Sequence, residues 1–453
     1  MTHVTIIGGG PGGYEAALVA SRLGAEVTLI ERDGVGGSTV LTDCVPSKTL
    51  IATSDLLTEV SGAAELGVEV PKAVRADLAA VDKRVLALAL AQSADIAERL
   101  VASGVTVISG TATVESAQLV VVDGTQRIET DAVLLATGAH PRISPDAQPD
   151  GERILTWEQV YALEALPEHM IVVGSGVTGA EFASAYNGLG ATVTLVSSRD
   201  RVLPGEDADA AAVIEDVFKR RGMTVLGNSR MASVERTADG VRVTLTDGRT
   251  VDGSHCLLAL GSIPNTEGLG LKTIGVTLKD DGFIYVDRVS RTSVRGVYAA
   301  GDCTGVLMLA SVAAQQGRIA MSHLLGDAVH PLDLGKVSSN VFTSPEIATV
   351  GLSQKQVDES DMQVDVAMLP LASNARAKMQ GVHDGFVKIF ARRGMGIVVG
   401  GVVVGPKASE LIHVISLAVS ASLTVDQVAD AFTIYPSLSG SVAEAARRLH
   451  RHT

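Results

Sequence analysis

Two segments of the chain, far apart in the sequence, share one pattern. Each has an apolar run, a Gly-rich turn, a helical stretch and a second apolar run within about 30 residues, which is the dinucleotide-binding βαβ unit. The parts are Val4–Ile7, residues 8–13 (GGGPGG), Tyr14–Leu23 and Glu26–Ile30 in the first segment, and Met170–Val173, residues 174–179 (GSGVTG), Ala180–Leu189 and Thr192–Val196 in the second. Because the unit occurs twice, we predict two Rossmann-like nucleotide-binding domains.

The glycine spacing has a physical reason. The first Gly turns the chain tightly, the second lets backbone N–H groups approach a pyrophosphate, and the third lets the helix pack on the strand. The phosphate then lies at the positive end of the helix dipole. We therefore expect cofactor contacts at Gly8, Gly10, Pro11 and Gly13 in the first turn, and at Gly174, Gly176 and Gly179 in the second.

The two units differ at the end of their second strand. Glu31 offers a carboxylate that accepts hydrogen bonds from both hydroxyls of an unphosphorylated ribose. The later unit has Ser197, Ser198 and Arg199 there. Hydroxyls and a guanidinium favour a 2′-phosphate, so Ser198 and Arg199 indicate NADP(H), with NAD(H) still open as a substrate. The alternative for Arg199 is a solvated loop charge.

Composition excludes several classes of protein. The chain has 453 residues, enough for about three domains. Its formal net charge of −14 argues against a nucleic-acid partner, which would require Lys and Arg at the phosphate backbone. No long apolar run, signal sequence or cysteine framework is present, so we expect a cytoplasmic protein without a membrane span. The ten His residues form no ligand spacing, so we expect no metal site.

The last part of the chain has no further Gly-rich nucleotide turn. We expect strands and helices to alternate there as an α+β unit suited to assembly. The expected strands are Gln363–Met368, Gly385–Phe390 and Gly396–Val404, and the expected helices are Ala408–Ser422, Val425–Ala431 and Val442–Leu449.

A set of short motifs resembles the flavoprotein disulfide reductases, specifically their lipoamide dehydrogenase branch. Residues 36–48 (GGSTVLTDCVPSK) are similar to that family's GGTCxxxxCxPSK loop, which lies against the flavin ring. Further landmarks follow in the family's order: residues 136–139 (ATGA), 261–265 (GSIPN), 297–302 (VYAAGD) and 342–346 (FTSPE). The resemblance covers essentially the whole chain.

The resemblance implies a fold and a set of cofactor contacts. The fold is α/β, with two Rossmann-like FAD- and NAD(P)-binding domains and a C-terminal α+β dimerisation domain. The implied segments are 1–150 and 269–333 for FAD, 151–268 for NAD(P), and 334–453 for dimerisation. Besides the turn residues and Glu31, the implied cofactor contacts are Gly37, Lys48, Ala112, Thr137, Gly138, Gly261, Asp302 and Ala310, of which Asp302 binds the ribityl chain in the family.

The departures from the family pattern indicate the function. The family's two loop cysteines form a redox disulfide, but here Thr39 stands at the first position and only Cys44 remains. A hydroxyl forms no disulfide and is a far weaker nucleophile than a thiolate. Near the C-terminus the family carries HxHPxLSE, with a His acid/base and a Glu that orients it. This chain has Tyr435 for the His and Gly440 for the Glu.

The family residues that serve electron transfer from the nicotinamide to the flavin are retained. Lys48 matches the family lysine beside the flavin, and Glu181 matches the carboxylate that pairs with it near the nicotinamide. With no disulfide to receive electrons, reduced flavin must pass them directly to an acceptor such as a quinone. The chain therefore looks like a lipoamide-dehydrogenase-like NAD(P)H:quinone reductase. The family implies a homodimer whose active site is completed by the partner chain.

Two residues keep several interpretations. Cys44 is a charge-transfer donor to flavin, a sulfenic-acid centre, or a thiol that only packs on the ring. Tyr435 contacts a quinone from the partner subunit, or fills the space of the missing His. Alternatives for the whole chain are a soluble transhydrogenase, a single-cysteine peroxidase, a mercuric-reductase-like enzyme, and a flavin redox sensor without catalysis. The retained Lys48 and Glu181 favour an enzyme.

Overall fold

The computed structural model describes residues 1–71 and 74–450. Internal contacts divide the chain into two units: Met1–Thr49, Asp82–Arg142 and Gly261–Asp333 in the first, and Leu50–Val81, Ile143–Leu260 and Leu334–Thr453 in the second. The expected boundaries at residues 150, 268 and 333 stay a prediction, and the last three residues of the expected dimerisation segment lie outside the described residues.

The first unit is built on a parallel sheet with the strand order β18-β7-β1-β2-β3. Its strands are Val297–Ala299, Ala132–Leu135, His3–Ile7, Glu26–Glu31 and Thr106–Ser109, in that order. The central strands are largely apolar and buried, with Val4, Ile6 and Leu134 all 0% exposed. Strands of a parallel sheet are covered on both faces, which explains why consecutive residues of these strands are buried.

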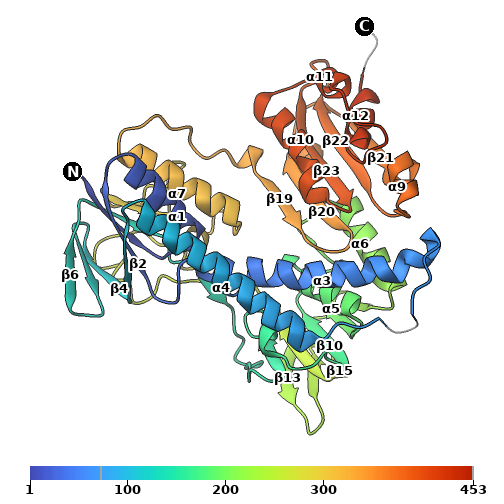
Figure 1. The fold of residues 1–453 in the computed structure, drawn as a ribbon, viewed down its shortest axis with the longest axis horizontal. Coiled ribbons are helices and arrows are strands. Elements are labelled where there is room, and N and C mark those ends of the chain that lie inside the picture. Colours follow the sequence, from blue (N-terminus) through green and yellow to red (C-terminus); the bar gives the residue numbers. More distant parts are fainter. Residues whose placement is uncertain (72–73, 451–453) are drawn as a thin grey trace. The chain divides into compact units, whose positions relative to one another are not determined.

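Helices α1 (Pro11–Arg22) and α7 (Ala310–Leu324) lie side by side against this sheet (Figure 1). They approach closely because both carry glycine at the contact: a Cβ at Gly317 would lie 2.1 Å from the carbonyl oxygen of Gly12. Helix α1 begins three residues before the expected Tyr14, with Pro at its first position, where the missing N–H costs no hydrogen bond. The Gly-rich turn is therefore partly the first turn of the helix.

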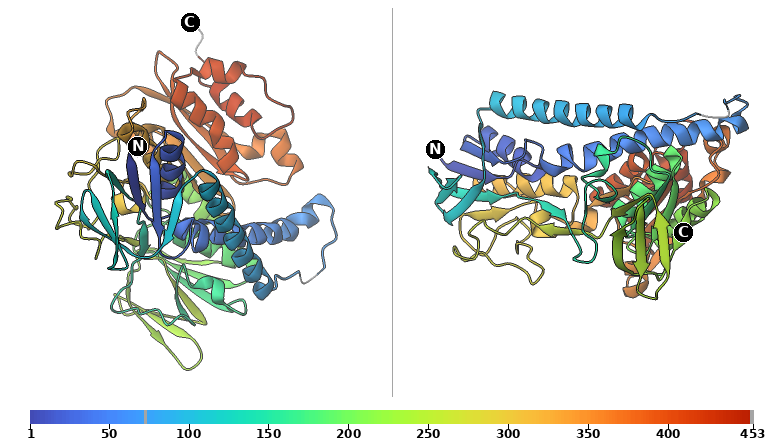
Figure 2. Two further views of the ribbon diagram at one scale, coloured as in Figure 1. Left: turned by 60° about the vertical axis from the view of Figure 1, so that its left-hand side comes forward. Right: turned by 90° about the horizontal axis from the view of Figure 1, so that it is seen from below.

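The first unit also contains two small antiparallel sheets. One has the order β4-β5-β6, with strands Ala112–Ser116, Leu119–Val122 and Gln126–Glu129. The other pairs β8 (Ala139–Pro141) with β17 (Ser262–Pro264). Helices α2 (Gly37–Leu41), α3 (Cys44–Gly62) and α4 (Leu78–Ala102) complete this part of the chain, and α3 and α4 continue across the boundary between the units. Figure 2 shows α4 as one unbroken helix, coloured blue to cyan.

The second unit begins with another parallel sheet, in the order β12-β11-β10-β16-β9. Its strands are Thr224–Leu226, Thr192–Val196, His169–Val173, His255–Leu258 and Ile154–Thr156. Helix α5 (Val177–Leu189) follows β10 and, like α1, starts inside the Gly-rich turn rather than at the expected Ala180. Helix α6 (Ala208–Arg220) and a meander of β13 (Met231–Arg236), β14 (Val241–Leu245) and β15 (Thr250–Gly253) complete the nucleotide-binding half.

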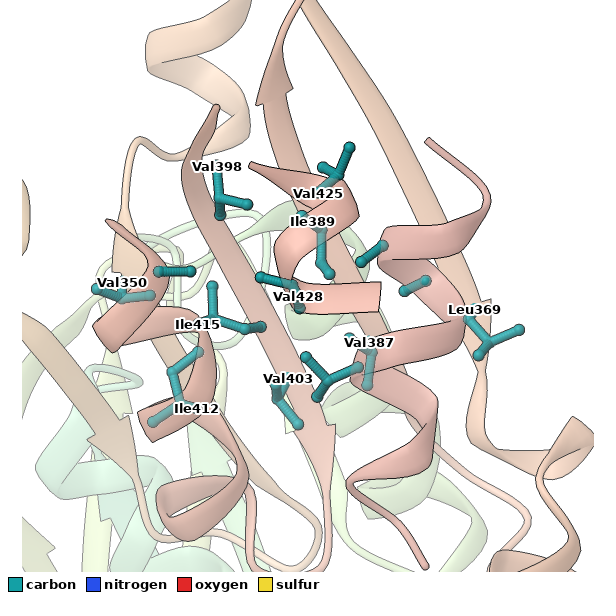
Figure 3. Close-up of a cluster of buried hydrophobic side chains, with 14 of the residues drawn as sticks. Val350, Leu369, Val387, Ile389, Val398, Val403, Ile412, Ile415, Val425 and Val428 are labelled. Carbon is teal, nitrogen blue, oxygen red and sulfur yellow. The ribbon is translucent and has the colours of Figure 1, made fainter. Parts of the chain in front are cut away.

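The C-terminal part of the second unit is an antiparallel sheet with helices on one face. The strand order β19-β20-β23-β22-β21 corresponds to Ser338–Val341, Glu346–Gly351, Val398–Gly405, Phe386–Arg392 and Val364–Pro370. The helices are α8 (Gln354–Glu359), α9 (Ala375–Met379), α10 (Ala408–Ala421), α11 (Val425–Asp430) and α12 (Gly440–Arg447). Figure 3 shows Ile415 and Val428 of the helices packing on Val387 and Val403 of the sheet. The expected α+β character of this segment is confirmed.

A buried ion pair joins this sheet to helix α6. Lys388 of β22 lies 2.9 Å from Asp207 and 2.6 Å from Asp209, and the side chains of Lys388 and Asp207 are 3% and 2% exposed. Asp207 also caps α6, because its carboxylate accepts from the N–H groups of Asp209 and Ala210. A buried charge with no partner would cost several kcal/mol, so this pairing holds the helix start against the strand in one register.

Candidate nucleotide-binding sites and redox loop

In the first unit, the expected FAD-binding residues follow the carboxyl ends of adjacent parallel strands. Gly8 follows β1, Glu31 ends β2, Thr137 follows β7 and Asp302 follows β18. Since these strands are neighbours in the order β18-β7-β1-β2, their carboxyl ends lie at one edge of the sheet. Nucleotides bind at this edge of open α/β sheets.

The first Gly-rich turn is sterically tight on one side and open on the other. A Cβ at Gly8 would lie 2.2 Å from the carbonyl oxygen of Ala136, and one at Gly13 would lie 1.9 Å from that of Gly8. Gly8 also has φ +102°, which strains any residue with a side chain. A Cβ at Gly10 would meet no atom within 4 Å. The turn thus presents open backbone at the start of α1, which fits a pyrophosphate group.

Glu31 is held in place by backbone N–H groups. Its Oε2 accepts from Gly9 at 2.6 Å and its Oε1 accepts from Asp33 at 2.7 Å. Oε1 also accepts from the N–H of Gly34 at 3.4 Å, so Oε2 is the oxygen that keeps a second lone pair for a ribose hydroxyl. The position and orientation of Glu31 therefore fit an unphosphorylated ribose, as FAD has on its adenosine.

The segment that follows β7 is hydrogen-bonded to the segment that comes after the second nucleotide-binding half in the sequence. Thr137 donates to the carbonyl oxygen of Asn265 at 2.7 Å, and the Asn265 amide donates to the Thr137 carbonyl at 2.9 Å. Asn265 also contacts His140, with its Oδ1 2.6 Å from His140 Nδ1. Gly138 and Gly261 have positive φ angles of 68° and 86°, so both need glycine for conformational reasons.

Asp302 and Ala310 lie at the end of the second FAD segment. Burial, with a smaller contribution from Asp43, raises the pKa of the Asp302 carboxyl to about 6. Ala310 is the first residue of the 15-residue helix α7. Ala112 begins β4 and is 4% exposed within the apolar core, so only its backbone can reach a cofactor. A half-buried acid after β18 fits the polyhydroxyl chain of FAD.

The redox loop is attached directly to the first turn. Gly36 N–H donates to the Gly9 carbonyl at 2.8 Å, and a Cβ at Gly37 would lie 3.0 Å from the Cα of Gly10. Thr39 lies in α2 and Cys44 begins α3. Cys44 and Lys48 are both half-buried and one helical turn apart, on the same face of α3.

The other two cysteines belong to the apolar cores. Cys256 and Cys303 are each 0% exposed. The Cys303 thiol donates to the carbonyl of Ala300 at 3.3 Å, and burial raises its pKa to about 11. Burial also raises the pKa of Cys256. Both stay neutral thiols and are packed as core residues. Cysteines 44, 256 and 303 are not joined by a disulfide.

The second Gly-rich turn repeats the first. A Cβ at Gly174 would lie 2.2 Å from the Ala259 carbonyl oxygen, and one at Gly179 would lie 1.8 Å from that of Gly174. Gly176 is open, with no atom within 4 Å of an added Cβ. This turn follows β10, and its neighbour β11 ends at Val196, just before the three polar residues of interest. The geometry fits a second dinucleotide.

Ser197 has a different position from Ser198 and Arg199. Its side chain is 0% exposed and shares a 2.7 Å hydrogen bond with the hydroxyl of Ser175 in the turn. Ser197 Oγ also accepts from the N–H of Arg199 at 3.1 Å. Ser198 and Arg199 are exposed. The sequence indicated the two exposed residues, but it did not show that buried Ser197 connects them to the turn.

Glu181 is a buried carboxylate on α5. It is 4% exposed, and its Oε1 accepts from the N–H of Phe342 at 2.9 Å. Lys48 belongs to the first unit and Glu181 to the second, so their expected pairing stays a prediction. Tyr435 is 86% exposed. The nearby side chains of Phe432 and Ile434 are also exposed, at 107% and 80%. Tyr435 lies on an apolar surface segment between α11 and α12.

The structure describes residues 1–71 and 74–450. Within these ranges no cluster of His, Cys, Asp and Glu has the geometry to hold a metal ion. In the same ranges, no helix has both the length and the hydropathy needed to cross a membrane.

Comparison with known proteins places the chain in a family. The model described as pyridine nucleotide-disulphide oxidoreductase matches residues 2–317, and that of its dimerisation domain matches residues 337–446. A Mycobacterium tuberculosis protein named NAD(P)H dehydrogenase (quinone) is 54% identical over 100% of this chain and 94% of its own length. Dihydrolipoyl dehydrogenase 2 of Haloarcula marismortui is 33% identical over 98% of this chain and 96% of its own.

Solved structures agree with this placement. The crystal structure of LpdA from Mycobacterium tuberculosis has a TM-score of 0.95 and 54% identity, with complete coverage of both chains. The flavoprotein disulfide reductase RclA of Escherichia coli, at 24% identity, has a TM-score of 0.89 and supports the fold alone. The expected α/β fold with a C-terminal dimerisation domain is confirmed. The chain belongs to the pyridine nucleotide-disulphide oxidoreductase family, whose enzymes use FAD and NAD(P)H.

Proposed function

We propose that this enzyme is an NAD(P)H:quinone reductase that passes electrons from NAD(P)H through FAD to a quinone or a similar acceptor. The observation that carries the proposal is Thr39, which stands where a redox disulfide would need its first cysteine. Without a second thiol in the loop, Cys44 has no dithiol chemistry to offer a disulfide substrate. The name of the 54% identical relative supports a quinone as the acceptor.

The residues of the chain have defined tasks in this function. The open turns at Gly10 and Gly176 bind the two pyrophosphates at helix N-termini. Lys48 supplies positive charge beside the flavin, and Glu181 fixes the end of β19 through the Phe342 N–H near the nicotinamide. FAD, when bound, accepts a hydride from NAD(P)H and passes the electrons on. Placing a cation where negative charge develops lowers the barrier to that transfer.

The second site is proposed to favour NADPH. Ser198 and Arg199 are exposed at the end of β11, where the 2′ position of the adenosine ribose lies in this type of domain. A guanidinium binds a phosphate through charge-assisted hydrogen bonds. Ser197 stands directly after the second strand and carries a hydroxyl, so this position does not repel the phosphate as a carboxylate would.

The functional form is proposed to be a homodimer whose active site is completed by the partner chain. The dimerisation-domain match over residues 337–446 supports this assembly. Phe432, Ile434 and Tyr435 are exposed apolar side chains next to each other in the sequence. Exposure of these apolar side chains to water is unfavourable, so their burial against a second subunit would stabilise the dimer. Tyr435 then supplies an aromatic hydroxyl near the acceptor.

The first experiment compares two acceptors. NADPH oxidation by the purified yellow protein should be rapid with menadione and absent with lipoamide, because the thiol pair is missing. Lipoamide turnover would contradict the proposal, since another group would then have to replace the second thiol. Absence of turnover with both acceptors would instead favour a redox sensor.

A second experiment restores the missing cysteine. Thr39→Cys should let the protein take up two more electrons per subunit in an anaerobic reductive titration, because a disulfide with Cys44 becomes possible. Ser38→Cys is the matched control: it adds a thiol one residue away on the same short helix and should add no electrons. Equal uptake by the two variants would show that position 39 is not the site of the family's first cysteine.

A further inference from the structure

Two residues with an unusual backbone conformation shape the loop that follows β11. We call this loop, residues 197–203, the Arg199 loop. Across the part of the chain that the structure describes, six residues other than glycine have positive φ angles. Leu203, which ends the loop, and Asn228, which contacts its middle, both have a φ of 51°. This conformation is unfavourable unless surrounding contacts fix it, and residues that adopt it are concentrated at binding and active sites.

The two ends of the Arg199 loop are bonded to the second Gly-rich turn. The N–H of Leu203 donates to the carbonyl oxygen of Ser175 at 2.8 Å. At the other end, the hydroxyls of Ser175 and Ser197 are 2.7 Å apart. Arg199 lies between these ends and its side chain is exposed. The turn therefore fixes where the loop starts and stops, but the place of Arg199 also depends on contacts with the middle of the loop.

The segment after β12 supplies those contacts through two consecutive N–H groups. The N–H of Asn228 donates to the carbonyl oxygen of Arg199 at 2.7 Å, and the N–H of Ser229 donates to that of Ser197 at 2.7 Å. The φ and ψ angles of Asn228 set the angle between these two N–H groups. Both bonds therefore form together only with residue 228 in the left-handed conformation, which asparagine and glycine adopt more readily than other residues. The Asn228 side chain itself is exposed.

Ser229 connects the same segment to the turn between β14 and β15. It is 1% exposed, and its Oγ accepts from Arg249 Nη2 at 2.8 Å and donates to the carbonyl oxygen of Gly227 at 3.0 Å. Arg249 is in turn paired with Asp247, at 2.7 Å. The Ser229 hydroxyl thus holds residues 227–229 in one arrangement, and their N–H groups hold the Arg199 loop.

We propose that Asn228 and Ser229 are positioning residues for nucleotide choice, because they hold the backbone of Arg199 where its guanidinium can meet the 2′-phosphate of NADPH. The inference rests on the proposed preference for NADPH and names the residues that make Arg199 effective. Neither residue contacts the nucleotide in this role. A loop that is already ordered binds more tightly than one that must become ordered on binding, so loss of this support weakens the phosphate contact.

A pair of substitutions at residue 228 tests the backbone conformation. Calorimetric titration of the FAD-loaded enzyme compares adenosine 2′,5′-bisphosphate with 5′-AMP, which lacks the 2′-phosphate. Asn228→Val should raise the dissociation constant of the bisphosphate about tenfold and that of 5′-AMP less than about twofold, because a β-branched residue disfavours positive φ. Asn228→Gly is the matched control, since glycine adopts this angle freely, and both constants should stay within about twofold of wild type. Equal weakening of the two ligands by Asn228→Val overturns the proposal.

A serine-to-alanine pair tests the second residue and is independent of backbone strain. Ser229→Ala should raise the dissociation constant of the bisphosphate about fivefold and leave that of 5′-AMP within about twofold of wild type. Ser254→Ala is the matched control: its hydroxyl also donates to a backbone carbonyl of this unit, that of His169, at 3.0 Å, and neither constant should change. A fall in kcat with NADH in Ser229→Ala as large as the loss of bisphosphate affinity would show a general structural role and overturn the proposal.

Arg199→Ala separates this inference from the preference on which it rests. If Arg199→Ala weakens only the bisphosphate while Asn228→Val and Ser229→Ala weaken neither ligand, the positioning role is wrong and the preference for NADPH stands. If Arg199→Ala changes both ligands equally, the phosphate contact itself is wrong and the positioning role is rejected with it.

Discussion

The two Gly-rich turns of this chain have nearly the same backbone and opposite side-chain chemistry. In each, a Cβ on the first glycine would lie 2.2 Å from a carbonyl oxygen of the neighbouring strand end. In each, a Cβ on the third glycine would reach the carbonyl oxygen of the first, at 1.9 Å for Gly13 and 1.8 Å for Gly179. The sterics of one strand–turn–helix unit therefore determine both turns.

The difference between the turns lies at the end of the second strand, at Glu31, which ends β2, and at Ser197, which follows β11. In the first turn the N–H of Gly9 donates to the carboxylate of Glu31, and in the second the hydroxyl of Ser175 bonds to that of Ser197. The acid is available to a ribose, whereas the buried serine leaves the ligand to Ser198 and Arg199. The comparison teaches that backbone geometry selects a dinucleotide and that the side chains after the second strand select which one.

The largest expected effect comes from a substitution that disturbs the backbone of the second turn, and its control is a substitution at the open glycine of the same turn. Gly179→Ala should raise the Michaelis constant for NADPH more than about 100-fold, because the methyl group would collide with the Gly174 carbonyl and displace the turn. Bound FAD should be retained, since the first turn is unchanged. Gly176→Ala has open space and should keep the wild-type melting temperature. Steady-state kinetics and flavin content measure both, and loss of flavin in Gly179→Ala would show that the turns are not independent.

The second-largest expected effect concerns Asp302, an acid of the first unit. Burial raises the pKa of the Asp302 carboxyl to about 6, and in the proposed site we expect its ionised form to accept hydrogen bonds from FAD. The dissociation constant for FAD should therefore rise as the pH falls through about 6. Asp302→Asn should bind about 30-fold more weakly at pH 8, with little pH dependence. Flavin fluorescence titrations from pH 5 to pH 8 measure this.

In the FAD-free protein, the free energy of unfolding should change with pH in the direction opposite to the affinity for FAD. Between the ordinary pKa of 3.8 and about 6, the native state holds a proton on Asp302 that the unfolded state has released. The free energy of unfolding therefore falls as the pH rises across this window. Exposed Asp281 is a matched control, and Asp281→Asn should leave both pH profiles unchanged. Identical profiles for wild type and Asp302→Asn would contradict the role of Asp302.

The smallest effect concerns nucleotide choice in the second region. Arg199→Ala should raise the Michaelis constant for NADPH about tenfold and that for NADH by less than twofold, because only NADPH carries the phosphate that the guanidinium binds. Arg242→Ala is a suitable control, since Arg242 is exposed in the same unit and paired with Asp252. Equal changes for the two nucleotides would mean that Arg199 is a solvated loop charge.

Local patterns predicted the strands and helices that flank the two Gly-rich turns and several of those in the last part of the chain. The expected helix at 408–422 is α10, Ala408–Ala421, and the expected strand at 192–196 is β11. In each of these segments the spacing of the apolar residues matches only one type of element, a helix or a strand. The starts of α1 and α5 were placed three residues too late, since glycine is a poor helix former. Tight packing against the strands overrides that propensity.

Contacts between distant residues were not predictable in the same way. The structure places Asn265 against His140, 125 positions away. Lys388 and Asp207 are 181 positions apart and form a buried pair. Nothing local marks these residues, because the partner of a polar side chain depends on which strands become neighbours in a sheet.

The sequence by itself determined the two nucleotide turns, the residues at the ends of their second strands, and the substitution of Thr39 for a cysteine. These properties depend on a few adjacent residues whose allowed backbone angles and chemistry are intrinsic. Only the tertiary structure decided that Ser197 is buried against Ser175 and that Glu181 holds the Phe342 N–H. Burial is a property of the packed chain, since removing water from a side chain requires neighbours that come from many places in the sequence.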